Sequence, residues 1–178
     1  KLATNMVQFL NSGKIDLAVM AAPNEELDSF NYPYEVLRQE ELVFAISKKH
    51  PLNKEMSIEK NYTMAEISEM FKKESFVLSD NGSSIRIMTD QIFRKHHFTP
   101  FCCCDVNSNR VQLELVSKGM GVCFIPVSYA NPDIGIEYYH MGPTISRANL
   151  VVFRTSGNSS EIERYFADLV KSHKYFQK

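Results

Sequence analysis

The sequence predicts an α/β fold in which buried strands alternate with amphipathic helices. Residues 15–20 and 42–46 are apolar on both faces, as strands inside a parallel sheet are. Apolar residues recur at helical spacing after the turn at residues 80–84, and again in residues 109–118 and 159–173. Strands that alternate with helices along the chain favour parallel sheets covered by helices.

Glycine, proline and capping residues set the bounds of these elements. Gly13 ends a first helix, and Pro51 ends a long extended stretch because the residue before a proline disfavours helix. Asn107 or Ser108 caps a helix that stops at Gly119. The expected helices span residues 5–12, 64–72, 84–97, 109–118 and 159–173, and the expected strands span residues 15–20, 34–47, 75–78, 101–106, 122–126, 135–139 and 150–153, with a loop over residues 24–32.

Two of these strands suggest two lobes. The strands that end near Ile46 and Ile125 are both apolar, and both stop at a proline boundary. A chain that passes twice between two lobes would cross at these points. We therefore expect residues 47–126 to form one lobe, with its own sheet, and residues 1–46 and 127–178 to form the other.

The charge of the chain is balanced, with 20 Lys and Arg against 21 Asp and Glu. Such a chain has no general electrostatic attraction to phosphate backbones or anionic lipid. Its longest apolar runs, residues 17–22 and 122–125, are far shorter than the roughly 20 apolar residues of a membrane helix. No secretion signal is visible, and the chain starts at Lys1 rather than Met, so we expect a fragment or a processed product.

Three of the four cysteines are consecutive, at Cys102, Cys103 and Cys104, and the fourth is Cys123. Successive side chains of a strand point to opposite faces, so the triplet is poorly placed to form a bridge within itself. Zinc sites prefer a two-residue gap between cysteines. The pattern favours reduced cysteines, with redox sensing or metal binding as the alternatives.

Three motifs, in this order, resemble the effector-binding domain of the LysR-type transcriptional regulators. Residues 12–19 (SGKIDLAV) resemble the family's step from a helix through glycine into Ile/Leu-Asp-Leu-Ala. Residues 42–46 (LVFAI), followed by His50-Pro51-Leu52, resemble its crossover strand and the exit from it. Residues 107–126, which contain Asn-Ser, Leu-Val, Gly-x-Gly and Phe-Ile-Pro, resemble its "NS…LV..G.G…LP" segment.

The resemblance implies the fold of type II periplasmic binding proteins, with two α/β lobes joined by two crossover strands and a ligand cleft between them. It implies the effector-sensing domain of a transcription regulator that responds to a small molecule of unknown identity. The full-length protein would be a cytoplasmic bacterial homo-oligomer that binds DNA only through an N-terminal domain absent here. No catalytic residue, metal, cofactor or membrane contact is expected.

The sequence departs from the family at its start. Family effector domains open with a strand, a helix and a second strand that precede the position of Lys1. We therefore expect the strand at residues 15–20 to have an open edge or to borrow a neighbour, since an unpaired apolar edge invites association. In the family, the helix that matches residues 109–118 packs on a partner's opening helix, so we expect a weakened or altered dimer.

The turn formed by Asn81, Gly82, Ser83 and Ser84 is the best candidate for ligand contact. It precedes a helix, whose free N–H groups and dipole favour an anion or a polar ligand. Its two hydroxyl groups add donors, and the matching family loop faces the cleft. Ordinary N-capping by Ser83 or Ser84 is the alternative, and the two roles are compatible.

The opposite wall of the cleft is expected to be small and mostly apolar. The resemblance assigns it Val127 and Ser128 after the second crossover, where simple chain reversal at Pro126 is the alternative. It also assigns Ala21 and Ala22 at the end of an earlier strand. Family members that recognise aromatic acids can carry an Arg at the position of Ala21 to hold a carboxylate. Alanine there argues for a less charged or larger ligand.

A solute-binding protein or an enzyme of the same two-lobe fold is the alternative function, because a fold alone does not determine function. A helix-turn-helix or a signal peptide upstream of Lys1 would separate the two. His96 and His97 follow Arg94 and Lys95, and cations are favoured at a helix C-terminus. Metal binding together with the cysteines is the alternative for these histidines.

Overall fold

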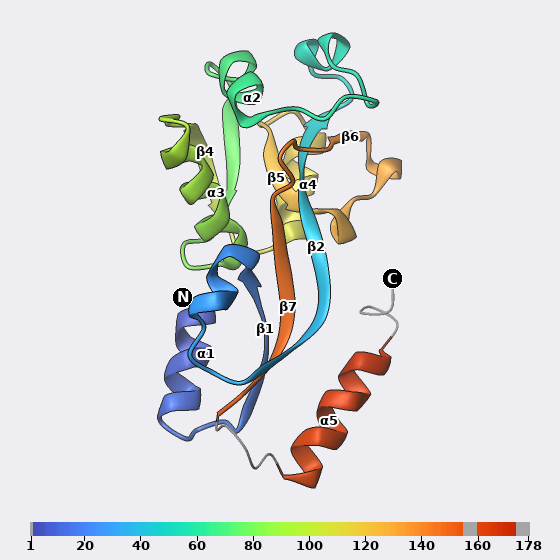
Figure 1. The fold of residues 1–178 in the computed structure, drawn as a ribbon. Coiled ribbons are helices and arrows are strands. Elements are labelled where there is room, and N and C mark those ends of the chain that lie inside the picture. Colours follow the sequence, from blue (N-terminus) through green and yellow to red (C-terminus); the bar gives the residue numbers. More distant parts are fainter. Residues whose placement is uncertain (1, 155–159, 174–178) are drawn as a thin grey trace. The chain divides into compact units, whose positions relative to one another are not determined.

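The structure, a computed structural model, describes residues 2–154 and 160–173 (Figure 1). The chain divides into two compact units. Unit 1 consists of Lys1–Glu40 and Ser146–Lys178, and unit 2 consists of Glu41–Ile145. The chain therefore passes twice between two α/β units, as expected, but the second passage lies some twenty residues later than predicted.

Unit 1 is built on antiparallel strands. β1 (Leu17–Pro23) pairs antiparallel with β7 (Ser146–Phe153) along its whole length, and β2 (Tyr34–Ser47) follows β7 in the sheet. We expected a parallel neighbour for β1, and that expectation was wrong. Helices cover both faces of β7, whereas β1 leaves Val19 exposed, and the apolar pattern of one strand does not encode the direction of its neighbour.

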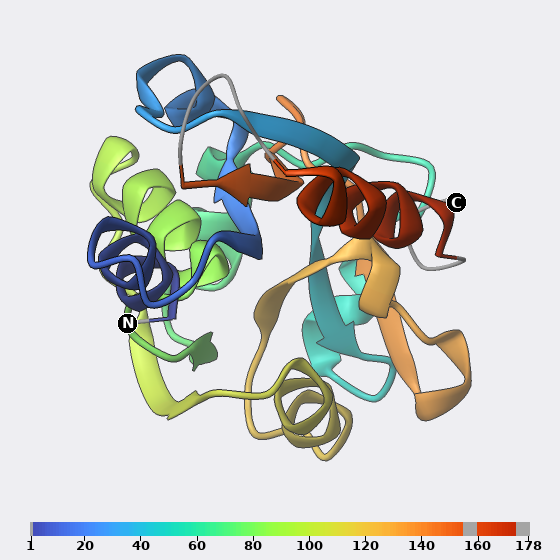
Figure 2. The same cartoon turned by 90° about the horizontal axis from the view of Figure 1, so that it is seen from below.

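The two helices of unit 1 cover opposite faces of the β1–β7 pair (Figures 1 and 2). α1 (Leu2–Asn11) buries Leu10 against Ala148, Leu150 and Val152, which lie on one face of β7. α5 (Glu161–Ser172) packs Ala167 against Val151 and Phe153, which point the other way because side chains alternate along a strand. A 3-10 helix, Asn24–Ser29, takes the place of the loop expected there.

Two parts of unit 1 are uncovered: one edge of its sheet and one face of its last helix. Within the described residues β1 pairs only with β7, so its second edge is open, as the sequence predicted. The helical spacing of residues 159–173 places Ile162, Phe166, Leu169 and Val170 on one apolar stripe. Of these four, Ile162, Phe166 and Leu169 are exposed, and α5 packs through Ala167 and Val170.

Unit 2 contains a parallel pair of strands, β3 (Ser75–Ser79) and β4 (Phe101–Val106). β5 (Cys123–Pro126) lies against β3, because Val122 forms a parallel bridge to Phe76 and exchanges backbone hydrogen bonds with Ser75 and Val77. Gly121 allows this approach, since a Cβ at that position would lie 2.5 Å from the carbonyl oxygen of Ser75. The remaining helices are α2 (Met64–Met70), α3 (Ser84–Lys95) and α4 (Asn109–Ser117).

Residues 127–145 belong to unit 2, which corrects the predicted lobe boundaries of 47–126 against 1–46 and 127–178. β5 and β6 (Ile136–Tyr139) both pair antiparallel with β2, and Pro126 lies opposite Leu42. Ile136, Tyr139 and Met141 are buried in unit 2. Pro126 therefore turns the chain back within one unit, and the crossing occurs where β7 begins.

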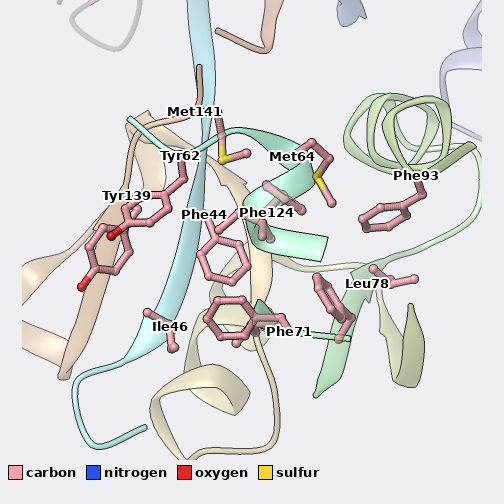
Figure 3. Packing of buried hydrophobic residues seen from close by; sticks show 13 residues of the cluster. Phe44, Ile46, Tyr62, Met64, Phe71, Leu78, Phe93, Phe124, Tyr139 and Met141 are labelled. Carbon is pink, nitrogen blue, oxygen red and sulfur yellow. The ribbon is translucent and has the colours of Figure 1, made fainter. Parts of the chain in front are cut away.

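An aromatic core holds unit 2 together (Figure 3). Phe44 of β2 packs between Phe71 and Phe124, with ring centroids 4.8 Å and 5.4 Å away. Phe93 of α3 extends this cluster on one side, and Tyr62 and Tyr139 extend it on the opposite side (Figure 3). The core thus combines residues that are up to about a hundred positions apart in the sequence.

Candidate functional site

The carboxyl ends of β3 and β4 lie side by side, because the two strands are parallel and Ser79 pairs with Val106. The backbone N–H of Asp80 donates to the carbonyl oxygen of Val106 at 2.7 Å. A helix begins just after each strand, and ligands of open α/β sheets bind at this edge. The edge collects backbone N–H groups from two helix N-termini, which suits an anionic or polar group.

The predicted turn lies at this edge. Gly82 has φ of +85°, a conformation that a side chain disfavours, and the N–H of Ser83 donates to the carbonyl oxygen of Asp80 at 3.2 Å. Ser83 Oγ accepts from the N–H of Arg86 at 3.1 Å, so the N-cap role considered for it is confirmed. Asn81 is exposed and Ser84 is buried.

Arg86, in the first turn of α3, anchors this edge. It donates to the carbonyl oxygen of Ser79 at 3.1 Å, to Asp105 Oδ1 at 2.7 Å and to Asp90 Oδ1 at 2.9 Å. Burial alone would lower the pKa of Arg86, but the hydrogen bonds and charges of the two aspartates outweigh it and raise that pKa. The guanidinium is thus neutralised by protein carboxylates, and hydroxyl and backbone N–H groups are the main donors of the turn.

A buried amide supports the turn from below. Gln112 of α4 donates through Nε2 to the carbonyl oxygen of Val77 at 2.8 Å and accepts at Oε1 from Ser79 Oγ at 3.3 Å. The helical pattern of residues 109–118 did not single out Gln112, and the apolar Val111 in that pattern is 44% exposed. The spacing of Gln112 to buried Val116, four residues on, is the signal that could have revealed it.

A second helix with a serine N-cap, α4, begins at the same edge. The sequence predicted Ser108 as a possible cap but not as part of a ligand site. Ser108 Oγ accepts from the N–H of Val111 at 3.5 Å, the outer limit of a hydrogen bond. Ser108 follows the end of β4, as Ser83 follows the end of β3. The carboxyl edge of unit 2 therefore presents two helix N-termini, each capped by a serine.

The residues expected opposite the turn fall in different units. Val127 and Ser128 form a short 3-10 helix after β5 and belong to unit 2 with the turn, which corrects their assignment to the other lobe. Ala21 and Ala22 lie in unit 1, where β1 pairs them with Asn149 and Ala148. The structure thus unites six of the eight predicted residues in one unit.

Unit 1 contains a buried ion pair that the sequence analysis did not find. Arg147 donates from Nε and Nη2 to Glu40 Oε1 at 2.8 Å and 2.6 Å, and Asn149 Nδ2 donates to the same oxygen at 3.1 Å. The Glu40 side chain has no exposed surface. Both residues lie next to the points where the chain passes between the units. The two residues are 107 positions apart, so the pattern within neither strand signals their pairing.

The cysteine triplet departs from the predicted alternation. Phe76 pairs with Cys102 and Val77 with Cys104, so Cys103 is an extra residue of the β4 strand. A bulge of this kind breaks the alternation of faces, and it brings the sulfur atoms of Cys103 and Cys104 to 3.9 Å. In the described ranges, no group of three His, Cys, Asp or Glu side chains could hold a metal ion, and no helix has the length and apolar character needed to span a membrane.

Known proteins of similar sequence are transcription regulators. Residues 2–174 match the LysR substrate binding domain. The HTH-type transcriptional regulator CfxR of Cupriavidus necator is 30% identical over 120 residues, which cover 67% of this chain and 34% of that protein. The chain therefore spans about a third of the length of this relative.

Solved structures of the same fold include ligand-bound regulatory domains. The CcmR regulatory domain of Synechocystis PCC6803 in complex with 2-PG has a TM-score of 0.74 at 17% identity and covers 94% of this chain and 77% of its own. The effector-binding domain of QuiR in complex with shikimate has a TM-score of 0.72 at 20% identity and covers 93% and 75%. These similarities establish the type II periplasmic-binding-protein-like fold, and the match over residues 2–174 establishes that the chain belongs to the LysR substrate-binding domain family.

Proposed function

We propose that this domain senses a small polar or anionic molecule at the carboxyl edge of β3 and β4 and passes the signal to a DNA-binding part of the same regulator. The observation that carries the proposal is the pair of serine-capped helix N-termini, at Ser83 and Ser108, on one edge of a parallel sheet. Donors preorganised in this way favour a carboxylate or phosphate group.

The chemistry of the edge narrows the ligand class. Arg86 is engaged by Asp90 and Asp105, so the ligand would be held by Asn81, Ser83, Ser84 and backbone N–H groups rather than by a guanidinium fork. The two similar proteins whose complexes are solved bind shikimate and 2-PG. We propose a ligand of that size class, with Val127 and Ser128 of the same unit as further contacts predicted from the sequence.

The family relationship favours a regulator over a solute-binding protein or an enzyme of the same fold. The proposed role has no catalytic step and no cofactor, and it places the protein in the cytoplasm, where its DNA target lies. Homo-oligomers are part of the proposal, because apolar side chains are exposed on α5 and, at Val111, on α4.

Two experiments test the proposed site. The first is a thermal-shift screen of the chain with shikimate and other small carboxylates and phosphates, followed by NMR for each compound that stabilises it. The amides of Gly82, Ser83, Ser84 and Asn109 should shift on binding. A compound that stabilises the chain but leaves all four amides unmoved would count against the site.

The second experiment uses the intact regulator and two substitutions. Ser83→Ala removes one side-chain hydrogen bond of the turn. It should weaken effector binding by about 1 kcal/mol, so that roughly fivefold more effector is needed for the same response. Ser84→Leu should block the site and abolish the response while DNA binding persists. A Ser84→Leu regulator that responds like wild type would exclude the turn as the effector site.

A further inference from the structure

Two thiols lie together on β4, away from the serine turns. Cys103 Sγ and Cys104 Sγ are 3.9 Å apart, and the Cys103 thiol also donates to the carbonyl oxygens of Phe76 and Met120, each at 3.4 Å. Cys103 is exposed and Cys104 is half-buried. The bulge is the cause of this proximity, because a regular strand would place adjacent side chains on opposite faces.

The third cysteine of the run takes a different environment. Cys102 Sγ lies 3.5 Å from Asp105 Oδ1, beside the Arg86 cluster. Burial and the charge of Asp105 raise the pKa of the Cys102 thiol. Cys123 is fully buried, and that burial strongly raises its pKa. Cys103 and Cys104 are therefore distinguished from both other cysteines by contact with each other.

The geometry of Cys103 and Cys104 does not favour oxidation of the pair to a disulfide. Disulfide-bonded residues have Cα atoms about 4.4–6.8 Å apart, whereas the Cα atoms of adjacent residues are held at about 3.8 Å by the peptide. The sulfur atoms would also have to close from 3.9 Å to about 2.0 Å. A single soft atom bonded to both sulfurs demands much less movement, since the sulfurs then stay non-bonded to each other.

The Cys104 thiol is also kept in the protonated form. Burial raises the pKa of Cys104, and the neighbouring Cys103 raises it further. The thiolate is the form that oxidants and alkylating agents attack, so the raised pKa protects Cys104 against both. Condensation with a hydroxylated or oxo thiophile releases water and requires no oxidant.

We propose that Cys103 and Cys104 form a vicinal dithiol site for thiophiles that take two sulfur ligands, with monosubstituted trivalent arsenicals as the chemical class. Two S–H bonds and the As=O bond of R–As=O are broken, two As–S bonds form, and one water leaves, so no atom is oxidised or reduced. Zinc is not expected, because zinc sites use three or four protein ligands and no third ligand group is assembled in the described residues.

The test uses phenylarsine oxide and the 178-residue chain, with the adduct measured by intact-mass spectrometry under native conditions. We expect one arsenical per chain, removed by 2,3-dimercaptopropanol and resistant to the monothiol 2-mercaptoethanol. Cys103→Ser and Cys104→Ser should each lower the apparent affinity by about tenfold or more, because the second bond of a bidentate site profits from a high effective concentration. Cys102→Ser is the matched control and should bind like wild type.

Each outcome decides the proposal. An adduct formed with wild-type affinity in Cys103→Ser or Cys104→Ser, or one that disappears in Cys102→Ser, would overturn the assignment, as would displacement by the monothiol. Circular dichroism of every variant checks the fold, and Cys103→Ala provides a second substitution at the exposed position. A folded Cys103→Ala chain that binds as tightly as wild type would also refute the site.

Discussion

The two units differ in how they use their apolar residues. Unit 2 packs Phe44, Phe71 and Phe124 against one another, and all three are buried (Figure 3). Unit 1 buries smaller residues between α1, β1 and β7, and it leaves Ile162 80% and Leu169 55% exposed on α5. Val19 is also exposed, on the face of β1 opposite to the one that α1 covers. Unit 2 therefore completes a core from its own residues, whereas unit 1 presents apolar surface that a further segment or copy could cover.

The largest expected effect lies in the aromatic core of unit 2. Phe71→Ala removes a fully buried ring and should lower the free energy of unfolding by about 3–5 kcal/mol. Ile162→Ala on α5, where the side chain is 80% exposed, should change it by less than about 0.5 kcal/mol. Urea unfolding followed by circular dichroism measures both. Equal losses would show that unit 1 is as tightly packed as unit 2.

In unit 1, the largest expected effect on stability comes from its buried charge pair. Glu40→Ala leaves the Arg147 guanidinium buried without its carboxylate and should cost about 3 kcal/mol. The double variant Glu40→Leu/Arg147→Met removes both charges and should recover most of that loss. A double variant no more stable than Glu40→Ala would mean that the pair contributes through packing rather than through charge compensation.

Self-association distinguishes the apolar surfaces of the two units. Leu169→Glu places a charge in the exposed stripe of α5 and should lower the fraction of oligomer in sedimentation velocity severalfold. Val111→Glu, on α4 of unit 2, should have a smaller effect, because Val111 is the one large apolar side chain exposed on α4, whereas α5 exposes four. Asp168→Asn on α5 is the control. A chain that stays monomeric at high concentration would remove the basis for this comparison.

The smallest expected effect is a pH dependence in unit 2. The hydrogen bond from Lys60, together with those from the backbone and side chain of Thr63, lowers the pKa of Glu66 to about 2. Because the folded pKa lies below the ordinary value of 4.5, the stabilisation is present above pH 4.5 and is lost as pH falls toward 2. NMR titration of the Glu66 carboxyl checks the pKa, and Glu66→Gln should abolish this part of the acid dependence. A Glu66 that titrates near 4.5 would contradict the contacts.

The sequence determined the local elements and the family-like motifs. The helix at residues 109–118, the long strand over residues 34–47 and the Ser83 cap are all confirmed, because periodicity, Pro51 and Ser83 act over a few residues. The turn at Asn81–Ser84 could be singled out for the same reason, since a glycine and two serines before a helix define both its shape and its donors.

The tertiary structure alone decided which elements share a unit and which faces are covered. Pro126 reads as a boundary, yet pairing of β6 with β2 keeps residues 127–145 in unit 2. The stripe on α5 reads as buried, yet the exposure of Ile162 and Leu169 depends on what the sheet below offers to cover them. Contacts between elements far apart in the sequence bury Gln112 and pair Glu40 with Arg147. A bulge in β4 brings the thiols of Cys103 and Cys104 together. Such contacts depend on register and packing, which the pattern within a single segment does not specify.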